Sequence, residues 1–264
     1  MQTTVQGRVV GYKESGQGAP LVLIHGYPLR CSMWKAQLEA FSSMAHVIAP
    51  DLRGFGESEN VPGTGDINFY ADDIRELLDS MGVHEPAVIA GHSMGGYVAM
   101  AYLRRYPSHV RALILANTKA TPDTTEGKAG RDRNIAIAKD KGAEAIAEGM
   151  LPKLFSPKTY TSNPELVEHA KEMMLKATVP GIIAALEAMR DRPDSTGTLL
   201  EYGSPTLVVA GADDQLMPMA EQETMKEASH DGTLVVVPDA GHLTMMEQPA
   251  AFNKAIMDFW EELA

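Results

Sequence analysis

Cysteine is almost absent from this chain. Of the 264 residues only Cys31 is a cysteine, so no intrachain disulfide can form. Long apolar runs are absent too, and none approaches the length of a membrane span. We expect no signal peptide, because the N-terminal residues lack a basic start followed by an apolar run. These absences together predict a protein of the reducing cytoplasm.

Positive charge is also scarce. The chain has 23 Lys and Arg against 35 Asp and Glu, a formal net charge of -12. Such an acidic surface repels phosphate groups, so we expect no nucleic-acid partner and no binding to anionic membranes. Hydrophobic residues make up 44% of the chain, which is enough for one large core carrying an inserted subdomain.

Short continuous apolar segments recur along the sequence and are typical of strands buried on both faces of a sheet. They are Pro20–Ile24, His46–Ala49, Pro86–Ala90, Ala112–Ala116, Thr206–Ala210 and Leu234–Val237. Helical patterns alternate with them at Asp72–Asp79, Met94–Tyr106 and Ala250–Glu262, and Thr3–Glu14 indicates an edge hairpin. This alternation predicts an α/β fold, with a mostly parallel sheet and helices on both faces.

The alternation stops between residues 119 and 202. Helical patterns alone fill this stretch, at Lys128–Lys141, Ala143–Leu154, Pro164–Ala177 and Pro180–Arg190. We therefore expect a core of residues 1–118 and 203–264, with a helical cap of residues 119–202 inserted after the sixth core strand. The cap helices have apolar faces that need cover. They can simply pack on the core, and we expect them also to roof a pocket.

The segment Gly91-His92-Ser93-Met94-Gly95 fits the pattern G-x-S-x-G. It follows a predicted strand and opens a predicted helix, which is the context of a nucleophile elbow. The glycines leave room for a sharp turn that lifts the Ser93 oxygen clear of the sheet. The alternative interpretation is a tight turn in which the serine caps the helix.

A serine nucleophile needs a general base, and His242 is the candidate. It follows the last predicted strand, at the same sheet edge as Ser93. The base in turn needs an acid on its far nitrogen. Asp213 and Asp214 both follow the strand Thr206–Ala210 and both are chemically suitable, although aspartates here are also ordinary turn formers. We take Asp214 as the acid and Asp213 as the alternative.

An oxyanion formed at Ser93 would need hydrogen-bond donors. The backbone N–H of Met94, the residue after the serine, is one candidate. The second is the backbone N–H of Tyr27, in the loop after the strand Pro20–Ile24. The alternative for this loop is a plain turn at the end of the strand.

With these motifs the sequence resembles the α/β-hydrolase superfamily, in the branch of esterases, enol-lactonases and cofactor-free haloperoxidase-like perhydrolases. The matching segments are Leu23–Pro28, Pro50–Ser58, Gly91–Gly96, Gly211–Pro218 and Gly241-His242. The resemblance implies an eight-stranded sheet with the second strand antiparallel, and a chemistry without metal or organic cofactor. The family's acid typically stands four residues before the proline of its loop, which favours Asp214 over Asp213. Residues 51–58 resemble a structural loop, to which we give no catalytic role.

The resemblance leaves several reactions open. Serine at the elbow, where haloalkane dehalogenases and epoxide hydrolases carry aspartate, favours an acyl-enzyme. Carbon–carbon bond hydrolases often have Asn at the position of His92 and a cap arginine for a substrate carboxylate. Arg131, Arg133 and Arg190 keep that alternative open. A perhydrolase or acyltransferase would use the same triad, and a non-catalytic homologue that binds a small molecule is the alternative from another class.

The pattern as a whole predicts a carboxylic ester hydrolase that acts on a small-molecule ester or lactone through a Ser93–His242–Asp214 triad. We expect Leu29, Met217 and Leu243 to line an acyl pocket, since they lie beside these motifs and methionine adapts to varied shapes. The alternative for these three residues is that they fill the core.

Overall fold

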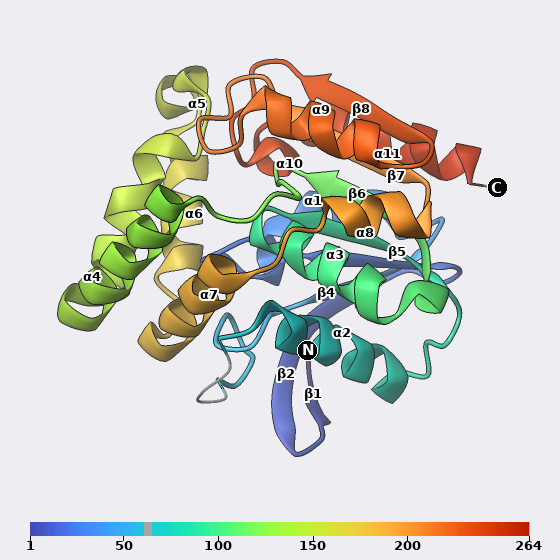
Figure 1. Ribbon diagram of the computed structural model, residues 1–264, viewed down its shortest axis with the longest axis horizontal. Coiled ribbons are helices and arrows are strands. Elements are labelled where there is room, and N and C mark those ends of the chain that lie inside the picture. Colours follow the sequence, from blue (N-terminus) through green and yellow to red (C-terminus); the bar gives the residue numbers. More distant parts are fainter. Residues whose placement is uncertain (61–64, 264) are drawn as a thin grey trace.

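The computed structural model describes residues 1–60 and 65–263, and eight strands within them form one sheet (Figure 1). Its strands are β1 (Gln2–Val5), β2 (Arg8–Ser15), β3 (Pro20–Ile24), β4 (His46–Pro50), β5 (Ala87–His92), β6 (Val110–Ala116), β7 (Thr206–Gly211) and β8 (Gly232–Val237). Their order across the sheet is β1-β2-β4-β3-β5-β6-β7-β8. Strand β2 pairs antiparallel with β1 and β4, and the remaining pairs are parallel. The predicted eight-stranded, mostly parallel sheet with an antiparallel second strand is confirmed.

Both faces of the sheet are buried, which explains why its central strands are continuously apolar. Successive side chains of a strand point to opposite faces. In β3, Leu21 and Leu23 belong to one hydrophobic cluster, whereas Val22 and Ile24 belong to the other. All four side chains are fully buried. The two clusters are the two halves of the core, one on each face of the sheet.

Helices cover both faces, as the alternating pattern predicts (Figure 1). On one face α2 (Ile67–Ser80) contacts α3 (Met94–Arg105), which contacts α8 (Thr196–Tyr202), which in turn contacts α9 (Met219–Ala228). On the other face α1 (Lys35–Phe41) and α10 (Thr244–Glu247) contact α11 (Pro249–Glu262). Short 3₁₀ turns lie at Cys31–Trp34, Pro107–His109 and Leu151–Lys153.

Between β6 and β7 the chain is helical, and most of this segment lies beside the sheet at one end (Figure 1). It contains α4 (Thr125–Met150), α5 (Pro157–Ser162), α6 (Pro164–Met174), α7 (Val179–Asp191) and α8. Helix α4 packs along α7 and also contacts α6. Helices α5 and α8 were not expected, and α8 lies against the core helices α3 and α9.

Helix α4 is interrupted where the sequence pattern predicts a break between two helices. Gly142 has a φ of 76°, a left-handed conformation that interrupts the helix and that glycine adopts without steric cost. The division of the chain into a core and a cap of residues 119–202 stays a prediction. Residues 61–64 and 264 lie outside the described part of the chain.

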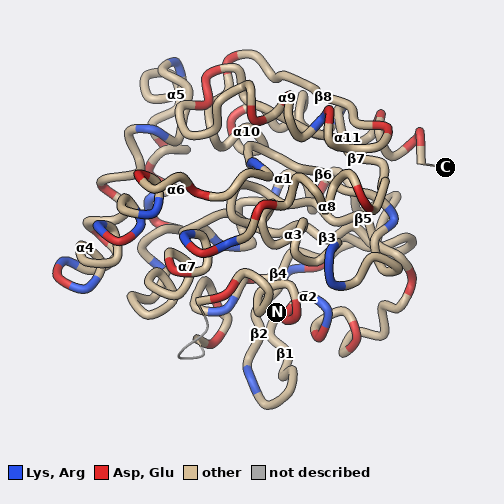
Figure 2. The backbone as a smooth tube through the Cα atoms, viewed as in Figure 1, with Lys and Arg blue, Asp and Glu red and all other residues tan. Residues whose placement is uncertain are grey.

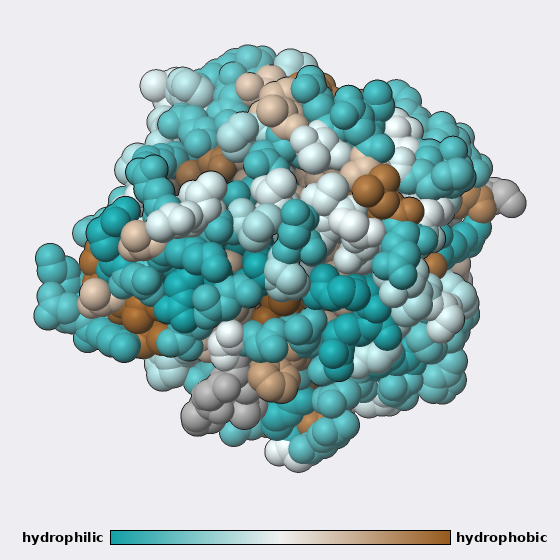
Figure 3. All heavy atoms as spheres, in the orientation of Figure 1, coloured by the Kyte–Doolittle hydropathy of each residue, from teal (hydrophilic) through white to brown (hydrophobic). Residues whose placement is uncertain are grey.

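Charged residues of both signs are interspersed along the elements, as the alternating colours on α4 and α7 show (Figure 2). The face seen in Figure 3 is mainly hydrophilic, and its hydrophobic residues form small separate groups. Within the described residues, no helix is both long enough and apolar enough to span a bilayer.

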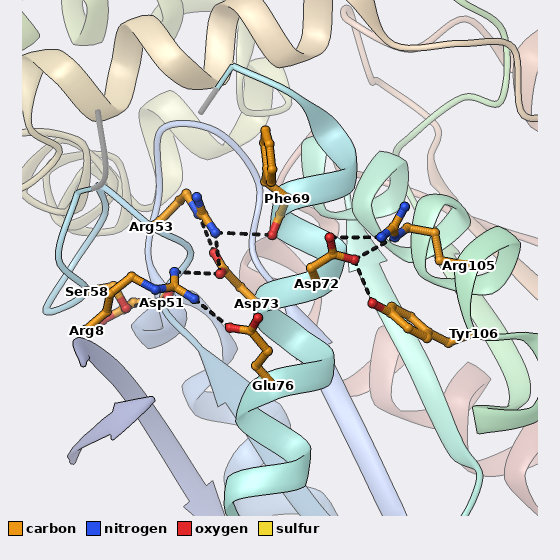
Figure 4. Close-up of polar contacts among 10 residues, drawn as sticks. All are labelled: Arg8, Asp51, Arg53, Ser58, Phe69, Asp72, Asp73, Glu76, Arg105 and Tyr106. Carbon is orange, nitrogen blue, oxygen red and sulfur yellow. Dashed lines mark hydrogen bonds and ion pairs between the residues drawn. The ribbon is translucent and has the colours of Figure 1, made fainter. Parts of the chain in front are cut away.

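Helix α2 is joined to its neighbours by two separate ionic contacts on different sides (Figure 4). Asp73 accepts hydrogen bonds from Arg53, in the loop after β4, and from Arg8 of β2 at 2.6 Å. The preceding residue, Asp72, instead accepts from Arg105 at 2.5 Å and 3.0 Å. The side chains of Asp73 and Arg53 are 10% and 8% exposed, whereas those of Asp72 and Arg105 are 26% and 40% exposed.

This difference in exposure predicts unequal effects of two neighbouring substitutions. Asp73→Asn leaves the buried Arg53 charge uncompensated and should lower the free energy of unfolding by about 3–5 kcal/mol. Asp72→Asn removes a solvent-screened pair and should cost less than about 1 kcal/mol. Urea denaturation of both variants measures these values, and equal losses would contradict the assignment.

Candidate active site

Ser93 occupies the turn between β5 and α3 with φ 51° and ψ −115°. A non-glycine residue in this region carries strain of about 1–3 kcal/mol, which the surrounding structure must hold in place. A Cβ at Gly91 would stand 2.2 Å from the Gly95 carbonyl oxygen, and a Cβ at Gly95 would stand 2.2 Å from that of Ile24. Only glycine fits at these two positions, so the motif glycines permit the sharp turn at Ser93.

His242 and Asp214 form a buried pair. The His242 Nδ1–H donates to Asp214 Oδ2 at 2.9 Å, and the two side chains are 3% and 2% exposed. This bond fixes the tautomer, so that Nε2 carries the free electron pair. The alternative acid, Asp213, is exposed, and within the described residues its side chain has no hydrogen bond to His242.

The Asp214 carboxylate is held in its charged form. Its other oxygen, Oδ1, accepts backbone hydrogen bonds from Leu216 at 2.8 Å and Met217 at 3.2 Å. Burial by itself would raise the pKa of Asp214, but the electrostatic interaction with His242 and the hydrogen bonds from His242, Asn117 and the Leu216 N–H together lower that pKa below its usual range. An ionised acid is what an imidazole needs in order to keep its orientation and to stabilise a proton on its ring.

Asn117 is a member of the site that the sequence pattern did not reveal. Its Nδ2 donates to Asp214 Oδ2 at 2.9 Å and to the Gly241 carbonyl at 3.2 Å. It stands directly after β6 with a φ of 48°. Its strand, β6, lies between the strands that precede Ser93 and Asp214. A polar residue at the carboxyl end of such a buried strand is a signal that would have pointed to Asn117.

His92, beside the serine, fixes the loop of His242. Its Nε2 donates to the His242 carbonyl at 2.8 Å, and the two rings stand 4.7 Å apart. Complete burial lowers the pKa of His92 well below its ordinary value, so the ring stays neutral. His25 has a comparable structural role: Nδ1 donates to the Gly26 carbonyl and Nε2 accepts from the Leu52 N–H.

The residues proposed as oxyanion donors are both buried, with Tyr27 6% exposed and Met94 fully buried. Met94 is the first residue of α3, where a helix leaves its backbone N–H groups without internal acceptors. Within the described residues no hydrogen bond from either N–H is found. Neither amide is therefore committed to another described backbone group.

Ser93 and His242 open onto one cavity of about 320 Å³ between the core and the helical segment above it. Its other lining residues are Tyr27, Arg131, Asn134, Gly149, Met150, Lys153, Met189, Leu216 and Met217. Helices α4 and α7 thus contribute to the walls beside the core loops. The polar cap residues Arg131, Asn134 and Lys153 were not predicted as site residues, although Arg131 was noted as a candidate for a substrate carboxylate.

The predicted acyl-pocket residues separate into two groups. Met217 lines the cavity. Leu29 and Leu243 do not: they are 1% and 0% exposed and belong to the hydrophobic cluster on one face of the sheet. Their apolar character serves the core, which was the alternative interpretation.

A sequence model described as the alpha/beta hydrolase family matches residues 21–255. The chain belongs to this family. Among curated relatives of this α/β-hydrolase, 3-oxoadipate enol-lactonase 2 from Acinetobacter baylyi is 29% identical over 255 residues, which cover 96% of this chain and 93% of that protein. A bifunctional esterase/perhydrolase from Acinetobacter calcoaceticus is 28% identical, with 97% of this chain and 98% of that protein covered.

Solved structures agree with this assignment. A thermophilic esterase from Thermogutta terrifontis, solved with malate bound, superposes with a TM-score of 0.95 at 39% identity, covering 100% of this chain and 98% of that one. These relatives are enzymes of hydrolase type that differ in substrate. Family membership therefore makes this α/β-hydrolase a hydrolase, and its substrate has to be inferred from the site.

The contact between Asn117 and Asp214 predicts an energetic coupling that can be measured without an activity assay. Asn117→Gly keeps the left-handed backbone available and removes the side chain with its amide. It should lower the free energy of unfolding by about 1–2 kcal/mol, because a buried carboxylate loses a donor. In a double-mutant cycle with Asp214→Ala, urea denaturation should show a coupling of about 1–2 kcal/mol. Additive losses would mean that the two side chains do not interact.

Proposed function

We propose that this α/β-hydrolase cleaves carboxylic esters or lactones through an acyl-enzyme on Ser93, with His242 as general base and Asp214 as the orienting acid. The observation that carries the proposal is the buried Asp214–His242 pair beside the strained Ser93 turn, with Ser93 and His242 lining one cavity. The relatives named as an esterase and an enol-lactonase support the same chemistry.

In the proposed first step, the Ser93 Oγ attacks the substrate carbonyl carbon while its proton passes to Nε2 of His242. Asp214 stabilises the resulting imidazolium through the Nδ1–H bond. The carbonyl oxygen becomes an oxyanion that accepts hydrogen bonds from the Met94 and Tyr27 N–H groups. Donors of this kind contribute about 3 kcal/mol each to transition-state stabilisation.

The tetrahedral intermediate then collapses. His242 gives its proton to the leaving alkoxide, and the acyl group stays on Ser93 as an ester. In the second half, water attacks this acyl-enzyme and loses its proton to His242. The proton returns to Ser93 as the carboxylic acid departs, so that the enzyme is regenerated without metal or organic cofactor.

The proposal predicts a sharp contrast between two adjacent aspartates. Asp214→Asn should lower kcat on p-nitrophenyl esters by on the order of 10⁴, because the amide favours the wrong imidazole tautomer. Asp213→Asn is the matched control and should keep nearly full activity, since its side chain is exposed. Ser93→Ala should abolish release of p-nitrophenol. Initial rates on esters and lactones of graded acyl length measure all three effects.

Two outcomes would contradict the proposal. If Ser93→Ala hydrolysed the esters as fast as the unsubstituted enzyme, Ser93 would not be the nucleophile. A larger loss of kcat in Asp213→Asn than in Asp214→Asn would show that Asp213, and not Asp214, is the orienting acid. Product analysis with added hydrogen peroxide or alcohol shows whether water is the acyl acceptor, because a perhydrolase or acyltransferase would divert the acyl group from hydrolysis.

A further inference from the structure

The loop that carries His242 lies directly against the helical segment between β6 and β7. A Cβ on Gly241 would stand 2.6 Å from the backbone nitrogen of Ser156, so only glycine allows the two backbones to approach this closely. On the other side of the imidazole, the Leu243 N–H donates to the Leu154 carbonyl at 3.2 Å. Both chain neighbours of His242 are therefore held against this segment.

The carboxylate of Glu247 joins the same two parts of the chain. Glu247 is the last residue of α10, the short helix that follows His242. Its Oε1 accepts from the Gly241 N–H at 2.7 Å. Its Oε2 accepts from the Ser156 N–H at 2.8 Å and from the Thr159 hydroxyl at 2.6 Å, at the start of α5. One oxygen thus serves the loop of the imidazole and the other serves the helical segment.

This arrangement requires a carboxylate rather than an amide of the same shape. Each Glu247 oxygen faces a backbone N–H, and a backbone N–H can only donate. A glutamine at this position would turn its NH₂ group toward the N–H of either Gly241 or Ser156, so that two donors would face each other. An ionised acceptor also makes the stronger hydrogen bond.

Glu247 complements the contacts that hold the opposite side of the Gly241 peptide. The Gly241 carbonyl accepts from Asn117 Nδ2 at 3.2 Å and from the Thr244 hydroxyl at 2.9 Å. The N–H of the same residue is held by Glu247. Loss of the Glu247 contact would let the backbone immediately before His242 tilt, and the imidazole would move with it.

We propose that Glu247 is a positioning residue for His242, and that it couples the alignment of the imidazole with Asp214 to the helical segment. Met150 and Lys153, just before the contacts of this segment with Glu247, line the cavity at Ser93. The wall of the cavity and the general base are then parts of one hydrogen-bonded unit. The inference rests on the proposed function for its effect on turnover, but not for its effect on the imidazole.

Steady-state kinetics on p-nitrophenyl butyrate test the effect on turnover. Glu247→Gln keeps the size of the side chain and should lower kcat by about 10- to 100-fold, the loss expected when a catalytic group is displaced by about 1 Å. KM should stay within about twofold, because Glu247 does not line the cavity. From the helical side, Thr159→Val should lower kcat by about threefold or more, whereas Thr159→Ser keeps the hydroxyl and should restore it.

Glu221 supplies the matched control. It is half-buried like Glu247 and accepts a hydrogen bond from the Thr121 hydroxyl at 2.8 Å. A hydroxyl can accept as well as donate, so an amide can replace this carboxylate. Glu221→Gln should therefore keep kcat and KM. A loss of kcat as large as that in Glu247→Gln would overturn the proposal, because the effect would not be particular to the loop of His242.

Proton NMR of protein labelled with ¹⁵N-histidine tests the imidazole without turnover. Loss of a signal in His242→Ala assigns the Nδ1 proton that is hydrogen-bonded to Asp214. Glu247→Gln should move this signal upfield, because a longer hydrogen bond deshields the proton less, and Glu221→Gln should leave it in place. A general loss of stability would not move the signal, which comes from folded molecules.

The two measurements separate this proposal from the proposed function. If the unsubstituted protein cleaves no ester but the signal moves in Glu247→Gln, the hydrolase proposal fails and the positioning role stands. If the esters are cleaved and Glu247→Gln changes neither kcat nor the signal, the positioning role is overturned and the hydrolase proposal stands. A change in kcat without a change in the signal, or the reverse, would also overturn the role. Thermal unfolding checks each variant, and if Glu247→Gln does not fold, Thr159→Val carries both measurements.

Discussion

The parallel register of four strands is the constraint on which the rest of the molecule depends. His92 of β5 pairs with Ala116 of β6, Ala116 pairs with Val209 of β7, and Gly211 of β7 pairs with Val237 of β8. The four strands therefore end along one edge, and the loops that follow them carry the serine, the amide, the acid and the imidazole. A slip of one residue in any pair would move side chains to the opposite face of the sheet and separate these groups.

Hydrogen bonds donated by side chains between neighbouring loops then set the finer geometry. His92 holds the His242 carbonyl, and Asn117 holds both the Asp214 carboxylate and the Gly241 carbonyl. The core thus supplies groups suited to acyl transfer. The helical segment between β6 and β7 adds a different property, because it lines the same cavity with the cationic side chains of Arg131 and Lys153 in an otherwise acidic protein.

Much of this arrangement was predictable, because strands buried on both faces read as continuous apolar runs and the G-x-S-x-G motif has a defined strand-to-helix context. The sequence also indicated the break at Gly142. Asn117 was missed, although its place after a buried strand was a signal, because its partner Asp214 lies beyond the whole helical segment in the sequence. Leu29 and Leu243 were assigned to a pocket because hydrophobicity does not distinguish a cavity wall from a core. Only the fold shows that Arg131, among the cap arginines, lines the cavity.

The central claim is that the strained turn and the buried Asp214–His242 pair make Ser93 a nucleophile. Its most direct test is mass spectrometry of the intact protein and its peptides after treatment with a fluorophosphonate, which modifies activated serines. The account predicts one adduct, located on Ser93, that forms on the order of 100-fold more slowly in His242→Ala because the base is missing. An adduct on another residue would contradict the role of Ser93. Equal rates of adduct formation in the unsubstituted protein and in His242→Ala would contradict the role of His242.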